Sequence, residues 1–211
     1  MLDILRQGRD EFGVVAVKAE FEAEGTRTDE LLRLLEIANK ADLGLALKIG
    51  GCEAIRDLLE AKQFGVRYII APMVETPYAL SKYIAAKEKI YSELEREDVT
   101  FLFNVETSTA FDNIEAMVQL AANNPGCDGV VFGRVDFSGS LGIGREGIET
   151  DQVTSAGEVI ARLCKDNGLE FVVGGAVSSD ALVSLRRFDD VHLDRFETRK
   201  VVFQAAALGE K

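Results

Sequence analysis

Short β-branched apolar runs alternate with longer amphipathic stretches along the chain. Runs at 14–17, 43–49, 68–72, 100–105, 129–133, 169–173 and 191–198 have the length and composition of buried strands. Between them, a helix opens at 28–32, and helices are predicted over 52–62, 76–97, 109–123, 153–166 and 179–187. The pattern therefore predicts seven strands separated by helices.

Near-continuous apolar strands that alternate with helices indicate a parallel sheet covered on both faces. Two architectures fit: a closed barrel and an open doubly wound sheet. An open sheet that binds a dinucleotide should carry GxGxxG after its first strand, but here that strand ends in Lys18-Ala19-Glu20. We predict a compact parallel (β/α) TIM-type barrel of the α/β class. Because no linker or low-complexity tract divides the chain, residues 1–211 are predicted to form a single barrel domain.

Charged residues follow successive predicted strands at nearly constant intervals. They are Glu20, Lys48, Glu75, Glu106 and Asp136, spaced 27 to 31 residues apart, or one strand–helix unit each. The carboxyl ends of barrel strands meet at one mouth, where barrel enzymes hold their active sites. For any single position, a solvated residue opening a loop is an equal alternative, but five in register favour a shared site.

Composition narrows the choice of partners and chemistry. The net charge of −12 disfavours nucleic acid, which repels an acidic protein. No stretch approaches the roughly 20 apolar residues of a membrane span, and the N-terminal residues do not resemble a signal peptide, so we expect a cytoplasmic protein. The single histidine, His192, excludes mechanisms that need paired histidines, and we expect it in the core or at a subunit contact.

Glu106 and Asp136 are the candidate metal ligands. Two carboxylates at neighbouring strand ends repel each other unless a proton or a cation lies between them. Hard divalent cations take oxygen ligands, and Mg²⁺ is commonly held by one or two carboxylates. The structural alternative is that both residues cap the helices that follow.

Four cations are expected near the mouth: Lys18, Lys48, Arg134 and Arg199. Lys48 ends a strand, so its ammonium can reach a substrate carboxylate or a developing enolate oxygen. A salt bridge from Lys48 to Glu20 or Glu75 is the alternative. If desolvated, Lys18 or Lys48 could instead act as a Schiff-base nucleophile.

Glycines at strand ends are candidate substrate contacts. Gly50 follows one predicted strand and Gly133 ends another. A backbone without a side chain can bring its N–H groups close to an anion. Turn formation alone also explains glycine at such positions. The segment 139–144 has the wrong spacing for a P-loop, and we interpret it as a flexible loop lining the mouth.

Three segments resemble the HpcH/HpaI aldolase and citrate lyase β-subunit family of the phosphoenolpyruvate/pyruvate-binding barrel superfamily. They are Ile70-Ala71-Pro72-Met73-Val74-Glu75-Thr76, then Val105-Glu106-Thr107 with Asn113-Ile114-Glu115, then Phe132-Gly133-Arg134-Val135-Asp136-Phe137-Ser138 with Leu141-Gly142. They lie in the family's order within roughly residues 14 to 200.

The resemblance implies a Mg²⁺ or Mn²⁺ site in which Glu106 and Asp136 match the family's two metal carboxylates. The metal would chelate the carboxylate and keto oxygen of a pyruvate-like 2-oxo acid and stabilise its enolate. Family members then make or break a carbon–carbon bond to an aldehyde or a thioester. The resemblance also implies a homo-oligomer.

The chain departs from the family pattern at two functional positions. Lys48 replaces a strand-end arginine that polarises the keto oxygen, and a lysine cannot give bidentate contact. Glu20-Phe21 replaces a Glu-His pair, so the family's catalytic histidine is absent. Glu20, Glu22 or a metal-bound hydroxide would then serve as the base. The resemblance further implies that the first barrel strand and the last helix are trimmed.

The leading hypothesis is a metal-dependent carbon–carbon lyase, aldolase or synthase acting on a small 2-oxo acid. In it, Glu20, Lys48 and Arg134 are catalytic, and Lys18, Lys48, Gly50, Gly133 and Arg199 contact substrate. A Schiff-base aldolase using Lys18 or Lys48 is the second hypothesis. The third is a barrel that binds a carboxylate or sugar acid without turning it over, which the missing histidine supports.

Overall fold

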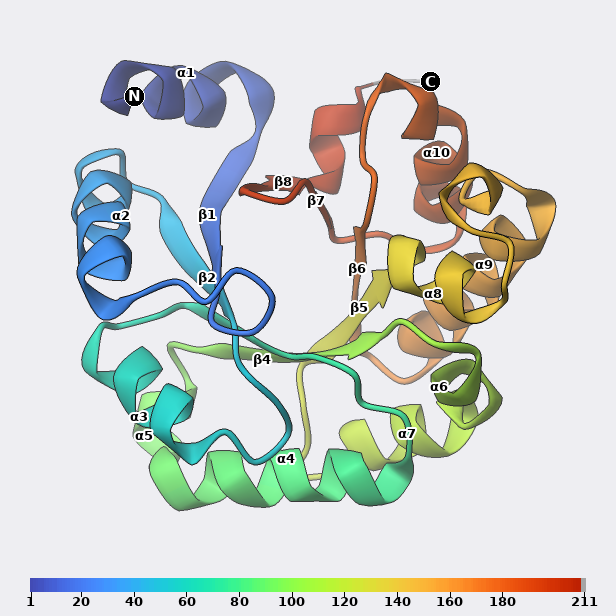
Figure 1. Ribbon diagram of the computed structural model, residues 1–211, viewed down its shortest axis with the longest axis horizontal. Helices are drawn as coiled ribbons and strands as arrows, with labels where there is room; N and C mark the ends of the chain where they lie inside the picture. The colour runs from blue at the N-terminus through green and yellow to red at the C-terminus, as the bar shows by residue number, and fades with distance from the viewer. Residues whose placement is uncertain (210–211) are drawn as a thin grey trace.

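The strands form a closed barrel in the computed structural model, which describes residues 1–209 (Figure 1). The eight strands follow one another around the barrel in chain order, so the predicted α/β barrel is confirmed. They are β1 (Val14–Glu20), β2 (Gly44–Lys48), β3 (Tyr68–Ala71), β4 (Thr100–Val105), β5 (Gly129–Gly133), β6 (Glu170–Gly174), β7 (Arg195–Glu197) and β8 (Val201–Gln204).

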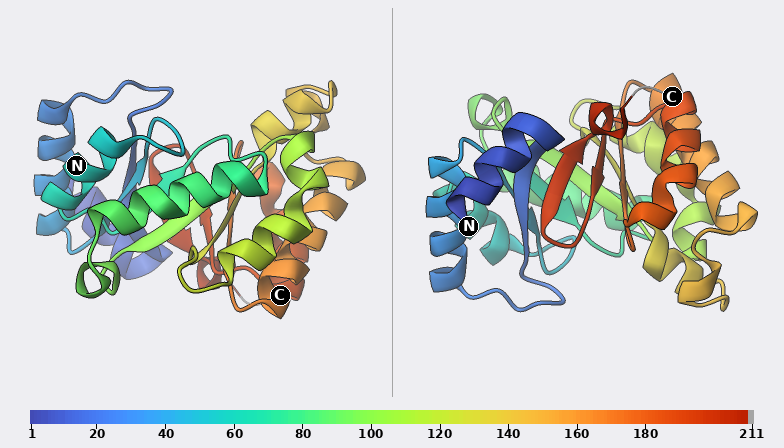
Figure 2. Two further views of the ribbon diagram at one scale, coloured as in Figure 1. Left: turned by 90° about the horizontal axis from the view of Figure 1, so that it is seen from below. Right: turned by 90° about the horizontal axis from the view of Figure 1, so that it is seen from above.

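Helices cover the outside of this barrel, with α4 lying along one side (Figures 1 and 2). They are α1 (Leu2–Phe12), α2 (Thr28–Lys40), α3 (Ile55–Gln63), α4 (Pro77–Ile90), α5 (Glu93–Arg96), α6 (Ser108–Asp112), α7 (Ile114–Ala121), α8 (Arg134–Ser140), α9 (Asp151–Asp166) and α10 (Leu182–Val191). Single 3₁₀ turns are η1 (Arg145–Gly147), η2 (Ser179–Ala181) and η3 (Ala205–Leu208). None of the helices in the described residues 1–209 is long and apolar enough to cross a membrane.

The eighth strand is the main difference from the predicted all-parallel barrel. Strand β8 pairs antiparallel with both β7 and β1 and so closes the barrel. Only residues 198–200 separate β7 from β8, and the Thr198 N–H donates to the Val201 carbonyl oxygen at 2.9 Å. Such a short turn permits antiparallel pairing only, because a parallel partner needs a long crossover. At its other edge, β8 lies against β1, which spans seven residues.

Several predicted elements have different bounds. The predicted helix 76–97 breaks where Tyr91 is extended, and Ser92 caps a new short helix, α5. The helix predicted over 109–123 divides at Asn113 into α6 and α7. Val191 belongs to α10, which leaves only Arg195–Glu197 of the predicted last strand. Helix α1, before the first strand, was not predicted.

The barrel interior is layered because alternate residues of each strand point inward. Near the amino ends of the strands, Ala16, Ala46, Tyr68 and Val202 pack together. Above them, Ile70, Leu102, Val131 and Val172 form a second apolar layer. One step further along, the inward positions hold Lys18, Lys48, Asn104, Gly133, Gly174 and Glu197, which all line one cavity. The apolar layers therefore end below the mouth, and the layer above them is formed largely by polar side chains.

Outside the barrel, aromatic rings fill the layer between β5, β6 and the helices α9 and α10. Phe132 and Phe188 meet edge to face with ring centroids 6.4 Å apart. Gly157 in α9 lies against both rings, and a Cβ there would come within 2.5 Å of Phe188. The glycine therefore sets how closely α9 packs.

We expect Gly157→Ala to lower the free energy of unfolding by about 1–2 kcal/mol. Overpacking costs about 1–3 kcal/mol, and the helix propensity gained is at most about 1 kcal/mol. Gly139→Ala is the matched control, because no atom lies within 4 Å of a Cβ built there. Urea denaturation of both variants measures the difference, and equal stabilities would contradict the close packing of α9.

Candidate active site

A cavity of about 510 Å³ opens at the carboxyl ends of the parallel strands. The residues on its wall include five acids, Glu20, Glu22, Glu106, Asp136 and Glu197, and four cations, Lys18, Lys48, Arg145 and Arg199. Four of the five charged strand-end positions thus come together on one cavity. Glu75 is not on the wall, and its carboxylate accepts a hydrogen bond from the Thr107 hydroxyl at 2.8 Å.

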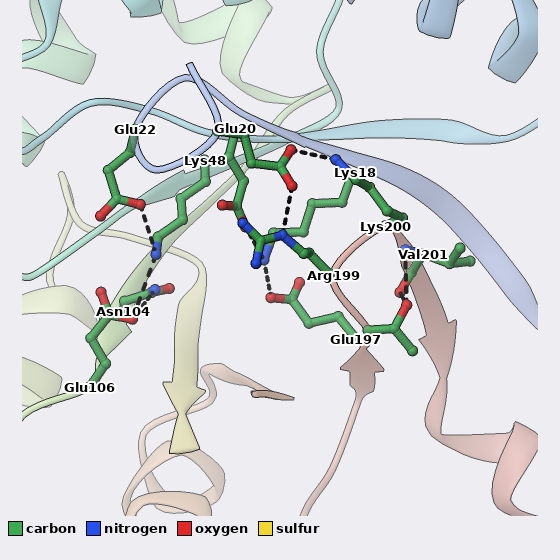
Figure 3. Close-up of polar contacts among 12 residues, drawn as sticks. Lys18, Glu20, Glu22, Lys48, Asn104, Glu106, Glu197, Arg199, Lys200 and Val201 are labelled. Atoms are coloured by element: carbon green, nitrogen blue, oxygen red, sulfur yellow. Dashed lines mark hydrogen bonds and ion pairs between the residues drawn. The ribbon is translucent and has the colours of Figure 1, made fainter. Parts of the chain in front are cut away.

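Glu106 is the most enclosed of these acids, with 2% of its surface exposed. Its Oε1 accepts the Met73 backbone N–H at 2.9 Å, and its Oε2 accepts the Asn104 side-chain amide at 2.7 Å. The Lys48 ammonium lies 3.7 Å from Oε2 (Figure 3). Burial raises the pKa of Glu106, and the nearby Asp136 charge adds to this, although these three donors oppose it. Several contacts thus hold the Glu106 carboxylate in a fixed orientation.

Asp136 lies in the first turn of α8, three residues beyond Gly133, where the predicted strand ends. Its side chain is exposed and faces the same cavity as Glu106. Within residues 1–209, the Asp136 carboxylate has no hydrogen bond or ion pair. Gly133 leaves room for the Glu106 side chain, because a Cβ there would lie 2.7 Å from both Cβ and Oε2 of Glu106.

Lys48 lies between two acids. Its ammonium is 3.0 Å from the Glu22 carboxylate in addition to its contact with Glu106. Burial alone lowers the pKa of Lys48, but Glu106, Glu22 and Glu20 outweigh this and raise the pKa above its ordinary value. Lys48 is therefore a charged ammonium at neutral pH, whereas a Schiff-base nucleophile needs a free amine.

A second group of charges occupies the β1–β7 side of the cavity (Figure 3). The buried Lys18 ammonium contacts the Glu197 carboxylate directly and lies 3.8 Å from Glu20. At the rim, Arg199 pairs with Glu24 at 2.7 Å. Lys18, Glu20 and Arg199 thus lie where the sequence predicted them, but both cations are already paired with acids.

Two strained backbone positions border the cavity. Met73 and Ala176 have φ angles of 51° and 50°, in the left-handed region that costs a non-glycine residue about 1–2 kcal/mol. At Met73 this conformation aims the N–H at Glu106. Such strain persists only where the surroundings impose it, and it is typical of functional sites.

Two predicted site residues do not face the cavity. The Arg134 side chain is fully buried, pairs with Glu149 at 2.9 Å and donates to Ser184 Oγ and the Gly175 carbonyl oxygen. The prediction that Arg134 faces the mouth, made from its place at a strand end, was wrong, because the side chain points outward between β6 and the helices. The Gly50 N–H is also unavailable to a ligand, because it donates to Asp57 at 2.7 Å.

The wall residues that the sequence analysis did not predict include Met73, Asn104, Arg145 and Glu197. Asn104 and Glu197 are polar residues inside apolar strands, at the inward phase of Lys18 and Glu106, and this was a usable signal. Arg145 follows a glycine-rich segment and has no comparable pattern. His192, at the barrel's other end, contacts the Leu169 carbonyl oxygen and Asp194.

The residues present suit a hard divalent cation. Glu106 and Asp136 supply two oxygen donors whose repulsion a cation would relieve. The buried Asn104 Oδ1, also on the wall, has no hydrogen-bond donor within residues 1–209, so it can accept from a metal-bound water or a substrate hydroxyl. Over the same residues, no cluster of three or more His, Cys, Asp or Glu side chains is placed to bind a metal. The pair of carboxylates would therefore need ligands from water or substrate.

The sequence profile described as HpcH/HpaI aldolase/citrate lyase matches residues 28–184. The chain belongs to this family, which confirms the resemblance. No curated protein sequence matches it.

Solved structures agree in fold. An HpcH/HpaI aldolase from Desulfitobacterium hafniense DCB-2 has a TM-score of 0.72 and 17% identity over 98% of this chain and 83% of its own. An HpcH/HpaI aldolase/citrate lyase family protein from Burkholderia cenocepacia J2315 has a TM-score of 0.71 and 15% identity over 94% and 93%. The citrate synthase variant SbnG has a TM-score of 0.67 and 17% identity over 94% and 81%.

Borohydride treatment in the presence of pyruvate should leave no reduced adduct on Lys48 or Lys18 at pH 7 to 8. The raised pKa of Lys48 keeps its ammonium protonated throughout this range, and Lys18 is held by two carboxylates. Peptide mass spectrometry checks both positions. A modified lysine at either one would support the Schiff-base hypothesis instead.

Arg134→Met should lower the free energy of unfolding by about 3 kcal/mol, the lower end of the cost of breaking a buried ion pair, because Glu149 is partly exposed. Arg187→Met is the control. Its two ion pairs are more exposed, so the loss should stay within about 1 kcal/mol. Denaturant titration measures both, and a neutral Arg134→Met would contradict a stabilising role for the buried pair with Glu149.

Proposed function

We propose that this protein is a metal-dependent carbon–carbon lyase, aldolase or synthase that acts on a pyruvate-like 2-oxo acid. The observation that carries the proposal is the pair Glu106 and Asp136 on one cavity wall, with Glu106 held by Met73, Asn104 and Lys48. Membership of a family of aldolases and lyases supports the reaction class.

Glu106 and Asp136 would hold Mg²⁺ or Mn²⁺, which supplies Lewis-acid stabilisation of an enolate when bound. The chain's own contribution is positioning. The Met73 N–H and the Asn104 amide fix the Glu106 carboxylate, and Gly133 leaves room beside it. A fixed carboxylate avoids reorganisation during the reaction, which is the advantage of a preorganised site.

Lys48 places a positive charge beside this pair. Its ammonium remains protonated, so it can attract the substrate carboxylate and stabilise negative charge on the keto oxygen. Lys48 is a point charge, unlike an arginine, and leaves the second oxygen of the substrate group to other donors. Gly133, Arg199 and Lys18 border the same space and stay candidate substrate contacts.

Glu20 is the proposed base that removes the proton from the carbon next to the keto group. Glu197 contacts Lys18 directly and Glu22 is 3.0 Å from Lys48, whereas Glu20 is 3.8 Å from Lys18, its one ion-pair partner among residues 1–209. The most loosely paired of these acids is the one best able to accept a proton. Once protonated, Glu20 can return the same proton to carbon in the reverse direction.

A non-catalytic barrel that binds a carboxylate or sugar acid is the second candidate. The observation that favours it is the absence of a histidine from the cavity wall among residues 1–209, since His192 lies elsewhere. We further propose a homo-oligomer in the cytoplasm that does not bind nucleic acid, supported by the family and by the acidic net charge.

The protein should exchange the methyl protons of pyruvate for deuterium in D₂O containing Mn²⁺ or Mg²⁺, as followed by proton NMR. EDTA should abolish this exchange. Glu106→Gln and Asp136→Asn should each slow it by about 100-fold or more, since even residues that only support metal ligands matter 10–100-fold.

Asp166→Asn, an exposed acid on α9, is the control and should exchange at the wild-type rate. Calorimetric binding of pyruvate without any exchange would favour the non-catalytic barrel. Exchange that survives EDTA would contradict metal dependence.

A further inference from the structure

Arg145 differs from the other cations on the cavity wall in having no acidic partner. Lys18 is neutralised by Glu197 and Glu20, Lys48 by Glu22 and Glu106, and Arg199 by Glu24. The Arg145 guanidinium, which lines the same cavity, has no hydrogen bond or ion pair within the described part of the chain, residues 1–209.

A well-anchored turn presents Arg145. It opens η1 directly after Gly144, whose φ of 63° suits glycine, and the turn closes with a bond from the Gly147 N–H to the Gly144 carbonyl oxygen. Gly147 and Ile148 are buried beneath it. A Cβ on Gly147 would come within 2.6 Å of Ile143, so the turn is tightly packed.

Buried Arg134 fixes the far end of this turn. It pairs with Glu149, four residues after Arg145, at 2.9 Å, while the Ser184 hydroxyl donates to the other Glu149 oxygen at 2.7 Å. The Thr150 hydroxyl donates to the Gly147 carbonyl oxygen at 2.7 Å. Arg134 thus acts on the mouth indirectly, as a positioning residue for the turn that carries Arg145.

Arg145 also lies at a different depth from Glu106. Glu106, Asn104 and Lys48 are buried, whereas Arg145 is exposed, as are Met73 and Asp136 on the same wall. A small 2-oxo acid bound at the buried carboxylate would leave the rim free. A guanidinium offers a planar fork of donors that matches a carboxylate or a phosphate.

We propose that Arg145 binds an oxyanion, a carboxylate or a phosphate, on the second substrate, the carbonyl compound that joins the enolate carbon or leaves it. The electrophile is then an anionic oxo compound. This inference rests on the proposed function and names the class of its second substrate.

The test compares Arg145→Gln and Arg145→Lys with Arg186→Gln, an exposed arginine on α10 away from the cavity. Each variant condenses pyruvate with glyoxylate, with glycolaldehyde phosphate and with uncharged glycolaldehyde. Arg145→Gln should lower kcat/KM for the oxyanion that is recognised by about 10–100-fold, the scale of a charged hydrogen-bonding pair. It should leave glycolaldehyde and the exchange of pyruvate protons unchanged, and Arg145→Lys should fall between.

The two charged aldehydes distinguish carboxylate from phosphate recognition. Equal losses with charged and uncharged aldehydes, or no loss, would overturn the proposal, and slower pyruvate exchange in Arg145→Gln would show that Arg145 meets the 2-oxo acid instead. If the wild-type protein exchanges no protons, the proposed function fails separately. Calorimetry with malonate and inorganic phosphate then decides on Arg145: binding lost in Arg145→Gln but not in Arg186→Gln supports it, and equal binding overturns it.

Discussion

A buried carboxylate at the end of an apolar barrel is the constraint around which the mouth is arranged. Glu106 is almost fully enclosed, and an isolated charge there would be costly. Three neighbouring contacts offset that cost. The backbone N–H of the strained Met73 and the side-chain amide of Asn104 donate hydrogen bonds to Glu106, and the Lys48 ammonium lies beside it. A buried carboxylate with a raised pKa, fixed by several contacts in a cavity, is typical of a functional site.

Much of the mouth was predictable because the apolar runs and the charges that follow them repeat at a regular interval along the sequence. Strands of a parallel barrel end at one rim, so evenly spaced charges are expected to meet there, as Glu20, Lys48 and Glu106 do, although Glu75 does not. The apolar runs likewise determined seven of the eight strands. The eighth, β8, has only four residues and follows a three-residue turn, so its pattern is too short to separate from a loop.

The errors arise where a side chain's direction matters more than its place in the sequence. Arg134 follows β5 as Lys48 ends β2, yet it points outward into a buried pair with Glu149, while Lys48 points inward. Gly50 was predicted to contact an anion through its backbone N–H, but that N–H donates to the Asp57 carboxylate, seven residues later in the chain. The position of Arg145 depends on packing beneath its turn, and that of Glu197 depends on how β7 and β8 close the barrel. Neither can be inferred from the neighbouring sequence.

The direction of β8 has one more consequence. Many barrels of this type cradle phosphate in the loops that follow their seventh and eighth strands, together with the start of a short extra helix. Here β8 runs downward, antiparallel to both neighbours, so its carboxyl end reaches the floor of the barrel near Gly13. On that side the rim therefore carries only the tight 198–200 turn. The two long loops that form a phosphate site in other barrels have no counterpart there.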